Sequence, residues 1–340
     1  MTSSPMTAST ASRNRRIVLA RRPQGAPVVE DFRLETVELE PLGEGQVRVR
    51  NRFLSLDPYM RGRMDEGKSY AAPQPLGETM IGGTVGEVVE SRHPKFQAGD
   101  AVVGMLGWQE IGTSDGTGLS KVSPALPLSV YLGCVGMPGV TAWYGLNRII
   151  APRAGQTVVV SAASGAVGSV VGQLARRAGC RVVGIAGGAE KCAYVRDELG
   201  LDACIDYKAG ELRAQLAEAT PDGIDGCFEN VGGEGLDAVL ARMNAHGRIA
   251  VCGLIAGYDG QDIPIRHARA ILVSRLLVQG FIVSEHPEVW PQALAELGGL
   301  VGRGELKYRE TVAQGLQAAP EAFLGLLKGR NFGKQLVRLD

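Results

Sequence analysis

Residues 157–186 read TVVVSAASGAVGSVVGQLARRAGCRVVGIA, and this stretch decides how the middle of the chain folds. An apolar strand over Thr157–Ser161 precedes a glycine-rich turn, and a helix-length segment over 166–178 leads to a second strand over Arg181–Ala186. The turn at 163–168 is G-x-G-x-x-G with alanine in the first position. In this context the pattern predicts a dinucleotide pyrophosphate site, and the alternative is a purely structural turn.

The glycines of this turn and the residues after the second strand indicate which dinucleotide binds. Gly165 lets the backbone approach the pyrophosphate, Gly168 lets helix and strand pack closely, and the helix N-terminus offers free N–H groups. A site for NAD would place an acidic residue after the second strand, but Gly187 and Gly188 follow instead. Lys191 can neutralise a 2′-phosphate, so we expect NADP, although an ordinary solvated lysine is the alternative.

Around this unit, apolar strands alternate with helix-length segments, which predicts a parallel doubly wound sheet of six strands. From Ile17 to about Val122 short alternating segments separated by Gly and Pro predict an antiparallel barrel or sandwich. After residue 306 we expect a helix over 320–328 and a last strand over 334–339 that returns to the first domain. The six strands of the doubly wound sheet are expected at 157–161, 181–186, 203–206, 226–229, 248–252 and 276–283.

Composition is that of a glycine-rich globular enzyme. The 340 residues suggest two domains, and 36 basic against 36 acidic residues give no electrostatic case for nucleic acid or an anionic membrane. No apolar run reaches the roughly 18 residues that a membrane span needs. We expect a tail over the first sixteen residues without a signal peptide. The six cysteines are scattered singly, and we expect all of them to be buried and to stay reduced in the cytoplasm.

Six blocks of sequence resemble one known family along nearly the whole chain. The family is that of the zinc-independent medium-chain dehydrogenase/reductases, of the prostaglandin reductase, leukotriene hydroxydehydrogenase and alkenal double-bond reductase type. The blocks are LDPYMR at 56–61, GMPGVTA at 136–142, AASGAVG at 162–168, ENVGG at 229–233, CGLI at 252–255 with Tyr258, and NFGK at 331–334.

The resemblance implies an α/β protein in which a Rossmann NADP-binding domain (136–305) lies between the two segments of a GroES-like, mostly β catalytic domain (1–135 and 306–340). It also implies NADPH in the cleft between them and a homodimer. The apolar stretch 276–283 fits a dimer because an exposed edge strand pairs readily with another copy. The expected cofactor-binding residues are Gly165, Ala166, Val167, Gly168, Gly187, Lys191, Tyr207, Asn230, Cys252, Gly253, Ile255, Tyr258, Phe281, Ile282, Val283 and Asn331.

A catalytic zinc ion is not expected. Its usual ligands are Cys and His with a further Cys or Glu, but by the resemblance LDPY at 56–59 occupies the region of the catalytic cysteine. GET at 77–79 likewise lacks the histidine of the zinc enzymes. We interpret the four histidines as surface residues. These are His93, His246, His267 and His286.

Without a metal, a nicotinamide is best suited to hydride addition at an electron-poor carbon, such as the β-carbon of an enal or enone. The developing enolate needs a hydrogen-bond donor. Tyr258, in a Gly-flanked loop, is the main candidate for this donor. It could donate directly or orient the nicotinamide ribose hydroxyl to donate. Water could then protonate the α-carbon. Tyr59 is a second candidate that could line the cleft, or simply pack on Pro58.

Two other functions stay open. A quinone could accept hydride in the same geometry, and a structural or regulatory protein could bind NADPH with little turnover. The intact Tyr258 and cofactor blocks favour the reductase. We therefore predict NADPH-dependent C=C reduction of small activated alkenes, with no nucleic-acid or membrane partner.

Overall fold

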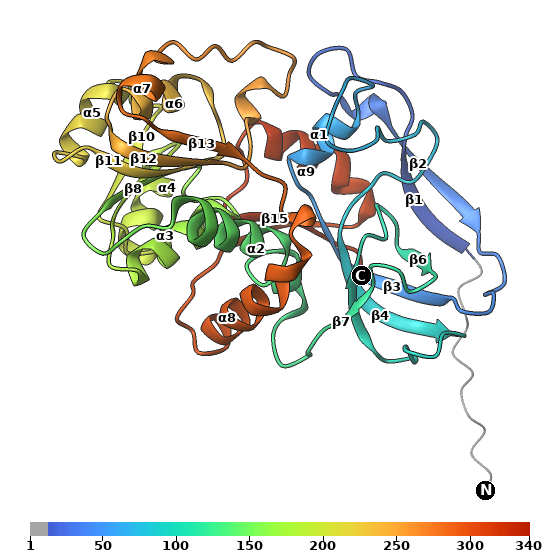
Figure 1. The fold of residues 1–340 in the computed structure, drawn as a ribbon. Coiled ribbons are helices and arrows are strands. Elements are labelled where there is room, and N and C mark those ends of the chain that lie inside the picture. Colours follow the sequence, from blue (N-terminus) through green and yellow to red (C-terminus); the bar gives the residue numbers. More distant parts are fainter. Residues whose placement is uncertain (1–12) are drawn as a thin grey trace, which may run out of the picture.

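The chain folds into two parts that lie side by side, as Figure 1 shows for a computed structural model that describes residues 13–340. The central half of the sequence forms one part, and the N-terminal and C-terminal segments together form the other. No helix within 13–340 combines the length and the apolar character needed to span a membrane.

The predicted N-terminal tail falls mostly outside the described residues, but its end was wrong. The first strand, β1 (Arg13–Leu19), begins before residue 16 and pairs antiparallel with β2 (Phe32–Glu38). Arginines of β1 meet glutamates of β2, with Arg13 Nε 2.7 Å from Glu38 and Arg16 Nη2 3.0 Å from Glu35. These cross-strand pairs extend the ladder into the basic segment.

The central part contains the predicted doubly wound sheet, and all six strands are parallel. Its strand order is β10-β9-β8-β11-β12-β13, which in chain order is 3-2-1-4-5-6, the order of a dinucleotide-binding sheet. The strands are β8 (Thr157–Ser161), β9 (Arg181–Ala186), β10 (Ala203–Asp206), β11 (Ile224–Glu229), β12 (Met243–Val251) and β13 (Leu277–Gly280).

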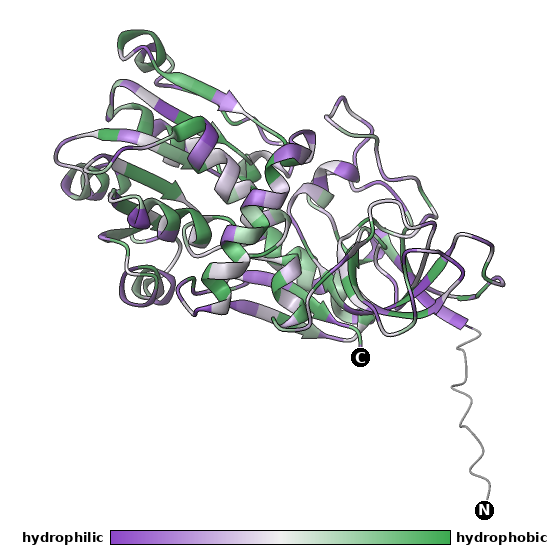
Figure 2. Ribbon diagram, turned by 60° about the horizontal axis from the view of Figure 1, so that its bottom comes forward, coloured by the Kyte–Doolittle hydropathy of each residue, from purple (hydrophilic) through white to green (hydrophobic). Residues whose placement is uncertain are grey.

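Alternate residues of these strands enter two hydrophobic cores, one on each face of the sheet. Val158 and Val182 lie in one core, whereas Val159 and Val183 lie in the other. Hydrophobic residues accordingly fill most of the strand interior in Figure 2. The helices of this part are α2 (Met137–Tyr144), α3 (Gly168–Arg177), α4 (Ala189–Ala193), α5 (Leu212–Ala219), α6 (Gly233–Leu240), α7 (Arg269–Val273) and α8 (Trp290–Gly302).

Several boundaries in this part differ from the prediction. The fourth strand begins at Ile224, not at residue 226, and the fifth covers Met243–Val251, not 248–252. The sixth strand ends at Gly280, not at residue 283, because Phe281 turns inward and packs its ring 5.3 Å from that of Tyr144. The helix after β8, α3, begins at Gly168, not at residue 166, because the Gly165 N–H donates to the Ala162 carbonyl and forms a turn before the helix.

In the other part, all strand pairings within residues 17–122 are antiparallel, as predicted, and the sheet becomes mixed only through a parallel pair from the C-terminal segment. Its order is β14-β15-β3-β4-β5-β7, with β6 on β3, and β14 pairs parallel with β15. The predicted return of the C-terminal strand is confirmed, since β15 pairs antiparallel with β3. The elements are β3 (Val47–Ser55), α1 (Tyr59–Arg63), β4 (Thr84–Ser91), β5 (Ala101–Gly104), β6 (Ile111–Ser114), β7 (Ser120–Lys121), β14 (Glu310–Gln314), α9 (Ala319–Leu327) and β15 (Lys334–Arg338).

Candidate active site

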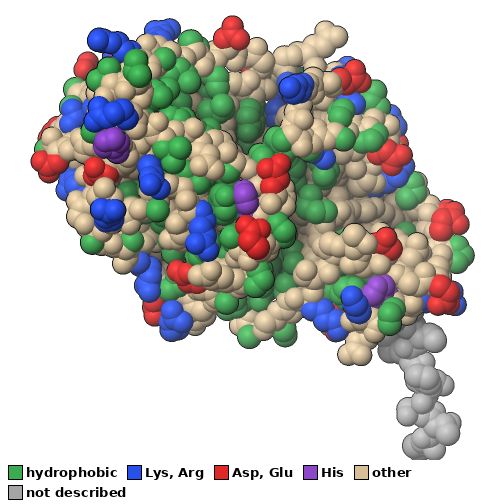
Figure 3. Space-filling model, viewed as in Figure 1, with side chains coloured by type: hydrophobic (Ala, Val, Ile, Leu, Met, Phe, Trp, Pro, Cys, Tyr) green, Lys and Arg blue, Asp and Glu red, His purple; other side chains and the backbone are tan. Residues whose placement is uncertain are grey.

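A cleft of about 1350 Å³ separates the two parts, and Figure 3 shows it as a hollow edged by hydrophobic side chains. A drug-sized ligand usually occupies a pocket of roughly 300–1000 Å³, so this cleft has room for a cofactor together with a substrate. Every residue that we predicted to bind the cofactor or to act in catalysis lines it. The cleft lies at the carboxyl ends of the parallel strands, where such sheets bind ligands.

The turn after β8 forms a narrow cradle. Ala162 has a positive φ of 48°, and Gly165 donates to its carbonyl oxygen at 2.9 Å. A methyl group on Gly168 would lie 2.3 Å from the same oxygen, so only glycine fits there. Within residues 13–340 the N–H groups of Ala166 and Val167 have no backbone acceptor and are free to bind an anion.

In the turn after β9, the aromatic ring of Tyr207 packs directly against Gly187. A methyl group on Gly187 would lie 2.7 Å from the Tyr207 ring, and Tyr207 itself is 53% exposed. Asp206, at the end of β10, accepts from the N–H groups of Gly188 and Lys208, at 2.8 and 2.9 Å. Its carboxylate is therefore engaged by the turn.

Lys191 lines this end of the cleft, and Lys208 lies close enough for its charge to act on Lys191. Lys191 Nζ donates to the Gly329 carbonyl at 2.7 Å. Burial first, and then the charge of Lys208, lowers the pKa of Lys191. A phosphate bound here would relieve the repulsion between the two ammonium groups. The glycine cradle, the free N–H groups and this lysine pair fit the pyrophosphate and 2′-phosphate of NADPH.

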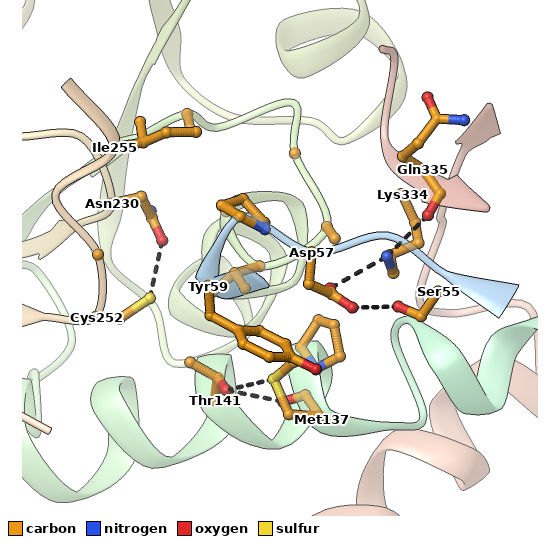
Figure 4. A pocket seen from close by; sticks show the side chains of 18 of the residues that line it. Ser55, Asp57, Tyr59, Met137, Thr141, Asn230, Cys252, Ile255, Lys334 and Gln335 are labelled. Carbon is orange, nitrogen blue, oxygen red and sulfur yellow. Dashed lines mark hydrogen bonds and ion pairs between the residues drawn. The ribbon is translucent and has the colours of Figure 1, made fainter. Parts of the chain in front are cut away.

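At the other end of the cleft, Asn230 and Cys252 follow β11 and β12. Asn230 donates from Nδ2 to the Ser161 carbonyl at 2.7 Å, and the Cys252 thiol donates to Asn230 Oδ1 at 3.1 Å (Figure 4). Burial and then the nearby Glu229 carboxylate raise the pKa of Cys252 to about 12. The thiol therefore stays protonated and helps to fix the Asn230 side chain.

Tyr258 lies just after a short 3-10 turn (Ile255–Gly257) and lines the same end. Burial raises its pKa to about 12, with smaller contributions from Tyr70 and Cys252. A phenol with this pKa is neutral at physiological pH and can donate a hydrogen bond to a developing oxyanion.

Tyr59 enters the cleft from the opposite part and is the first residue of α1. Burial, followed by the charge of Asp57, raises its pKa. The turn that carries it is held by a buried ion pair, in which Lys334 Nζ lies 3.1 Å from Asp57 Oδ1. Lys334 also donates to the Leu56 carbonyl at 2.7 Å, and Ser55 donates to Asp57, as Figure 4 shows.

The C-terminal segment joins the two ends of the site. Gly333 forms a parallel bridge with Gly165 of the phosphate cradle, and the next residue, Lys334, holds the turn before Tyr59. The sequence reading included Lys334 in a family block without a role. Lys334 contacts Asp57 and Leu56, which are far from it in the sequence, so no local sequence pattern could have revealed the ion pair.

Sequence reasoning also missed Arg63, Tyr70 and Lys208. Arg63 and Tyr70 line the cleft beside Tyr59. Tyr70 sits in a segment without periodicity or motif, so only the folded structure brings it to the site. Lys208 directly follows Tyr207, which we predicted to bind the 2′-phosphate end of the cofactor. This position in the sequence could have identified Lys208 as a second phosphate-binding cation.

Within residues 13–340 no three His, Cys, Asp or Glu side chains are grouped as a metal site. None of the four histidines is buried, which confirms their surface interpretation. The six cysteines are free, but Cys204 and Cys252 are partly exposed, so the prediction that all are buried was wrong. Cys252 is exposed because it lines the cleft.

Comparisons with known proteins agree with this architecture. A family model described as the N-terminal domain of oxidoreductase matches residues 15–122, and one described as zinc-binding dehydrogenase matches residues 166–298. The chain is 48% identical to NADPH-dependent curcumin reductase of Escherichia coli (strain K12), over 96% of this chain and 97% of that protein. It is 43% identical to 2-alkenal reductase (NADP(+)-dependent) of Nicotiana tabacum, over 96% and 98%.

A solved structure is also close: CurA from Vibrio vulnificus in complex with NADPH matches with a TM-score of 0.92 and 44% identity, over 96% of this chain and 99% of that one. Identity at this level over nearly the full length establishes the relationship. The chain therefore belongs to the zinc-independent medium-chain dehydrogenase/reductase family, the group that includes the curcumin, prostaglandin and 2-alkenal reductases.

Proposed function

We propose that this protein is an NADPH-dependent reductase that transfers hydride to the β-carbon of α,β-unsaturated aldehydes or ketones. One observation carries the proposal: the neutral phenol of Tyr258 lies in the same cleft as the cradle and lysines that fit NADPH. The similarity to a curcumin reductase and a 2-alkenal reductase, both NADPH- or NADP-dependent by name, supports it.

On this proposal, the residues of the two ends have separate tasks. Ala166, Val167 and Lys191 bind the phosphates, and Asn230, held by Ser161 and Cys252, shapes the nicotinamide end. NADPH, when bound, supplies the hydride. Gly187 and Tyr207 would hold the adenosine end of NADPH. The remaining predicted cofactor contacts are Gly165, Gly168, Gly253, Ile255, Phe281, Ile282, Val283 and Asn331.

Tyr258 then acts on the substrate. As the β-carbon gains hydride, negative charge moves to the carbonyl oxygen, and the Tyr258 phenol donates a hydrogen bond to it or to the ribose hydroxyl that contacts it. The high pKa of the phenol keeps the proton on Tyr258, and the α-carbon takes its proton from water. Tyr59 and Tyr70 flank the substrate and shield it from solvent.

A substrate panel tests the proposal. Purified protein is mixed with NADPH and either a 2-alkenal, an enone or a quinone, and nicotinamide absorbance is followed. We expect oxidation with the alkenal and enone. Oxidation with the quinone alone would favour a quinone reductase, and no oxidation with any acceptor would favour an NADPH-binding structural or regulatory role.

We also propose a homodimer formed through β13. Among residues 13–340 this strand pairs only with β12, and its four residues are exposed, including Leu277 and Val278 at 43% and 39%. An open apolar edge is a surface on which the same strand of a second copy can pair. Sedimentation of the wild type and of Val278→Lys tests this, since a monomeric wild type would refute it.

Two further expectations accompany the function. We propose boundaries near residues 136 and 306 between a nucleotide-binding domain and a catalytic domain built from both chain ends. We also propose a cytoplasmic location, which the six free cysteines support. Limited proteolysis and cell fractionation test these two expectations.

A further inference from the structure

A positively charged side chain of the cleft, that of Arg63, has no partner among the described residues. Arg63, the last residue of α1, lines the cleft, and its Nε is buried without a hydrogen-bond partner among residues 13–340. A guanidinium carries five N–H donors and stays charged at every physiological pH. Leaving such a group half-buried and unpaired is costly, so its retention in a ligand cleft points to a ligand.

The acidic residues near Arg63 in sequence or space are already engaged by other cations. Within the described part of the chain, no carboxylate lies within ion-pair distance of Arg63. The nearby carboxylates each form an ion pair with another residue: Asp65 with Arg61 at 2.7 Å, Glu66 with Arg22 at 3.4 Å, and Asp57 with Lys334 at 3.1 Å. The charge of Arg63 therefore faces the cleft uncompensated.

Arg63 lies at the substrate end of the cleft. Its charge lowers the pKa of both Tyr59 and Tyr70 against the raising effect of burial. Tyr70 in turn is close enough to Cys252 and Tyr258 for their charges to interact. Tyr70 therefore lines the cleft within electrostatic reach of both Arg63 and Tyr258, the residue expected to contact the substrate carbonyl.

The cofactor does not supply the missing anion. The groups that fit its phosphates are the N–H groups of Ala166 and Val167 and the ammonium of Lys191, all on the other part of the protein. What remains for Arg63 is an anionic group on the substrate. A carboxylate suits it best, because a guanidinium binds a carboxylate through two parallel hydrogen bonds.

We propose that Arg63 is a substrate-binding residue that recognises a carboxylate, so that the preferred substrates are enones or enals carrying an acid group on the same molecule. This inference rests on the proposed reductase function. It goes beyond that function because it says which enones and enals are preferred and which side chain selects them. A charge-assisted hydrogen bond of this kind changes binding by roughly tenfold to hundredfold.

The test compares straight-chain enones that end in a carboxylate, with spacers of different length, with the methyl ester of each. For the wild type we expect kcat/KM to be at least about tenfold higher for the best acid than for its ester. In Arg63→Ala this ratio should fall close to one through a rise in KM for the acid. Arg63→Lys keeps the charge and should retain part of the preference.

Lys121→Ala is the matched control, since Lys121 also lines the cleft but is paired with Asp100 at 2.7 Å, and its acid-to-ester ratio should not change. Equal loss of kcat on acid and ester in Arg63→Ala would overturn the proposal, because it would make Arg63 a donor to the enolate. An unchanged ratio would also overturn it. Turnover of the esters by the wild type tests the reductase function separately.

Discussion

Replacing Lys191 by alanine tests which end of the cleft holds the 2′-phosphate. Lys191 lines the cleft together with Gly187 and Tyr207, and among residues 13–340 its Nζ donates only to the Gly329 carbonyl. A hydrogen bond to a charged group contributes about 1.5–3 kcal/mol, or roughly tenfold to hundredfold in affinity. Lys208 stays in place to offset part of the loss, so we expect about a tenfold weaker binding of NADPH.

The assay is a fluorescence titration of the reduced nicotinamide with wild type, Lys191→Ala and Lys208→Ala. NADH lacks the 2′-phosphate, and its affinity should stay within about twofold in all three proteins. The double variant should approach equal affinity for NADPH and NADH. An unchanged NADPH-to-NADH ratio in Lys191→Ala would refute the assignment, and an equal loss for both would show that Lys191 supports the fold instead.

Four further results are expected. The pKa of Lys191 lies below its usual value, and only the protonated amine attracts phosphate. The affinity for NADPH should therefore fall relative to that for NADH as the pH rises through this pKa, which titrations at increasing pH would show. Tyr258→Phe should lower kcat on enones by roughly 10²–10³-fold without weakening NADPH binding, as rapid kinetics and titration would show. Gly168→Ala should abolish measurable NADPH binding, because its methyl group would lie 2.3 Å from the Ala162 oxygen. Lys334→Met should lower the free energy of unfolding in urea by about 3–5 kcal/mol, and adding Asp57→Ala should recover part of it.

The nucleotide half of the site follows from sequence because its determinants are local. The cradle at Gly165 and Gly168 and the glycines after β9 lie within one strand-turn-helix-strand unit, where each residue type has a direct conformational reason. The strands of that unit were predicted to the residue. The sixth strand was predicted too long, because its apolar pattern continues into Phe281, which leaves the sheet to join the core.

The substrate half depends on contacts between distant segments. Arg63 ends α1, and Tyr70 comes from the irregular segment that follows it. Tyr258 comes from the loop after β12, and Lys334 comes from the last strand. Neither hydrophobic periodicity nor turn chemistry specifies how such segments meet. Tyr258 and Tyr59 were found only because a family resemblance marked their blocks.

Isotope transfer tests the central claim most directly. NADPH deuterated at the transferring position is incubated with the protein and an α,β-unsaturated ketone, and the product is analysed by NMR. We expect a saturated ketone with deuterium on the β-carbon and the carbonyl intact. Deuterium on the carbonyl carbon of an allylic alcohol would contradict it.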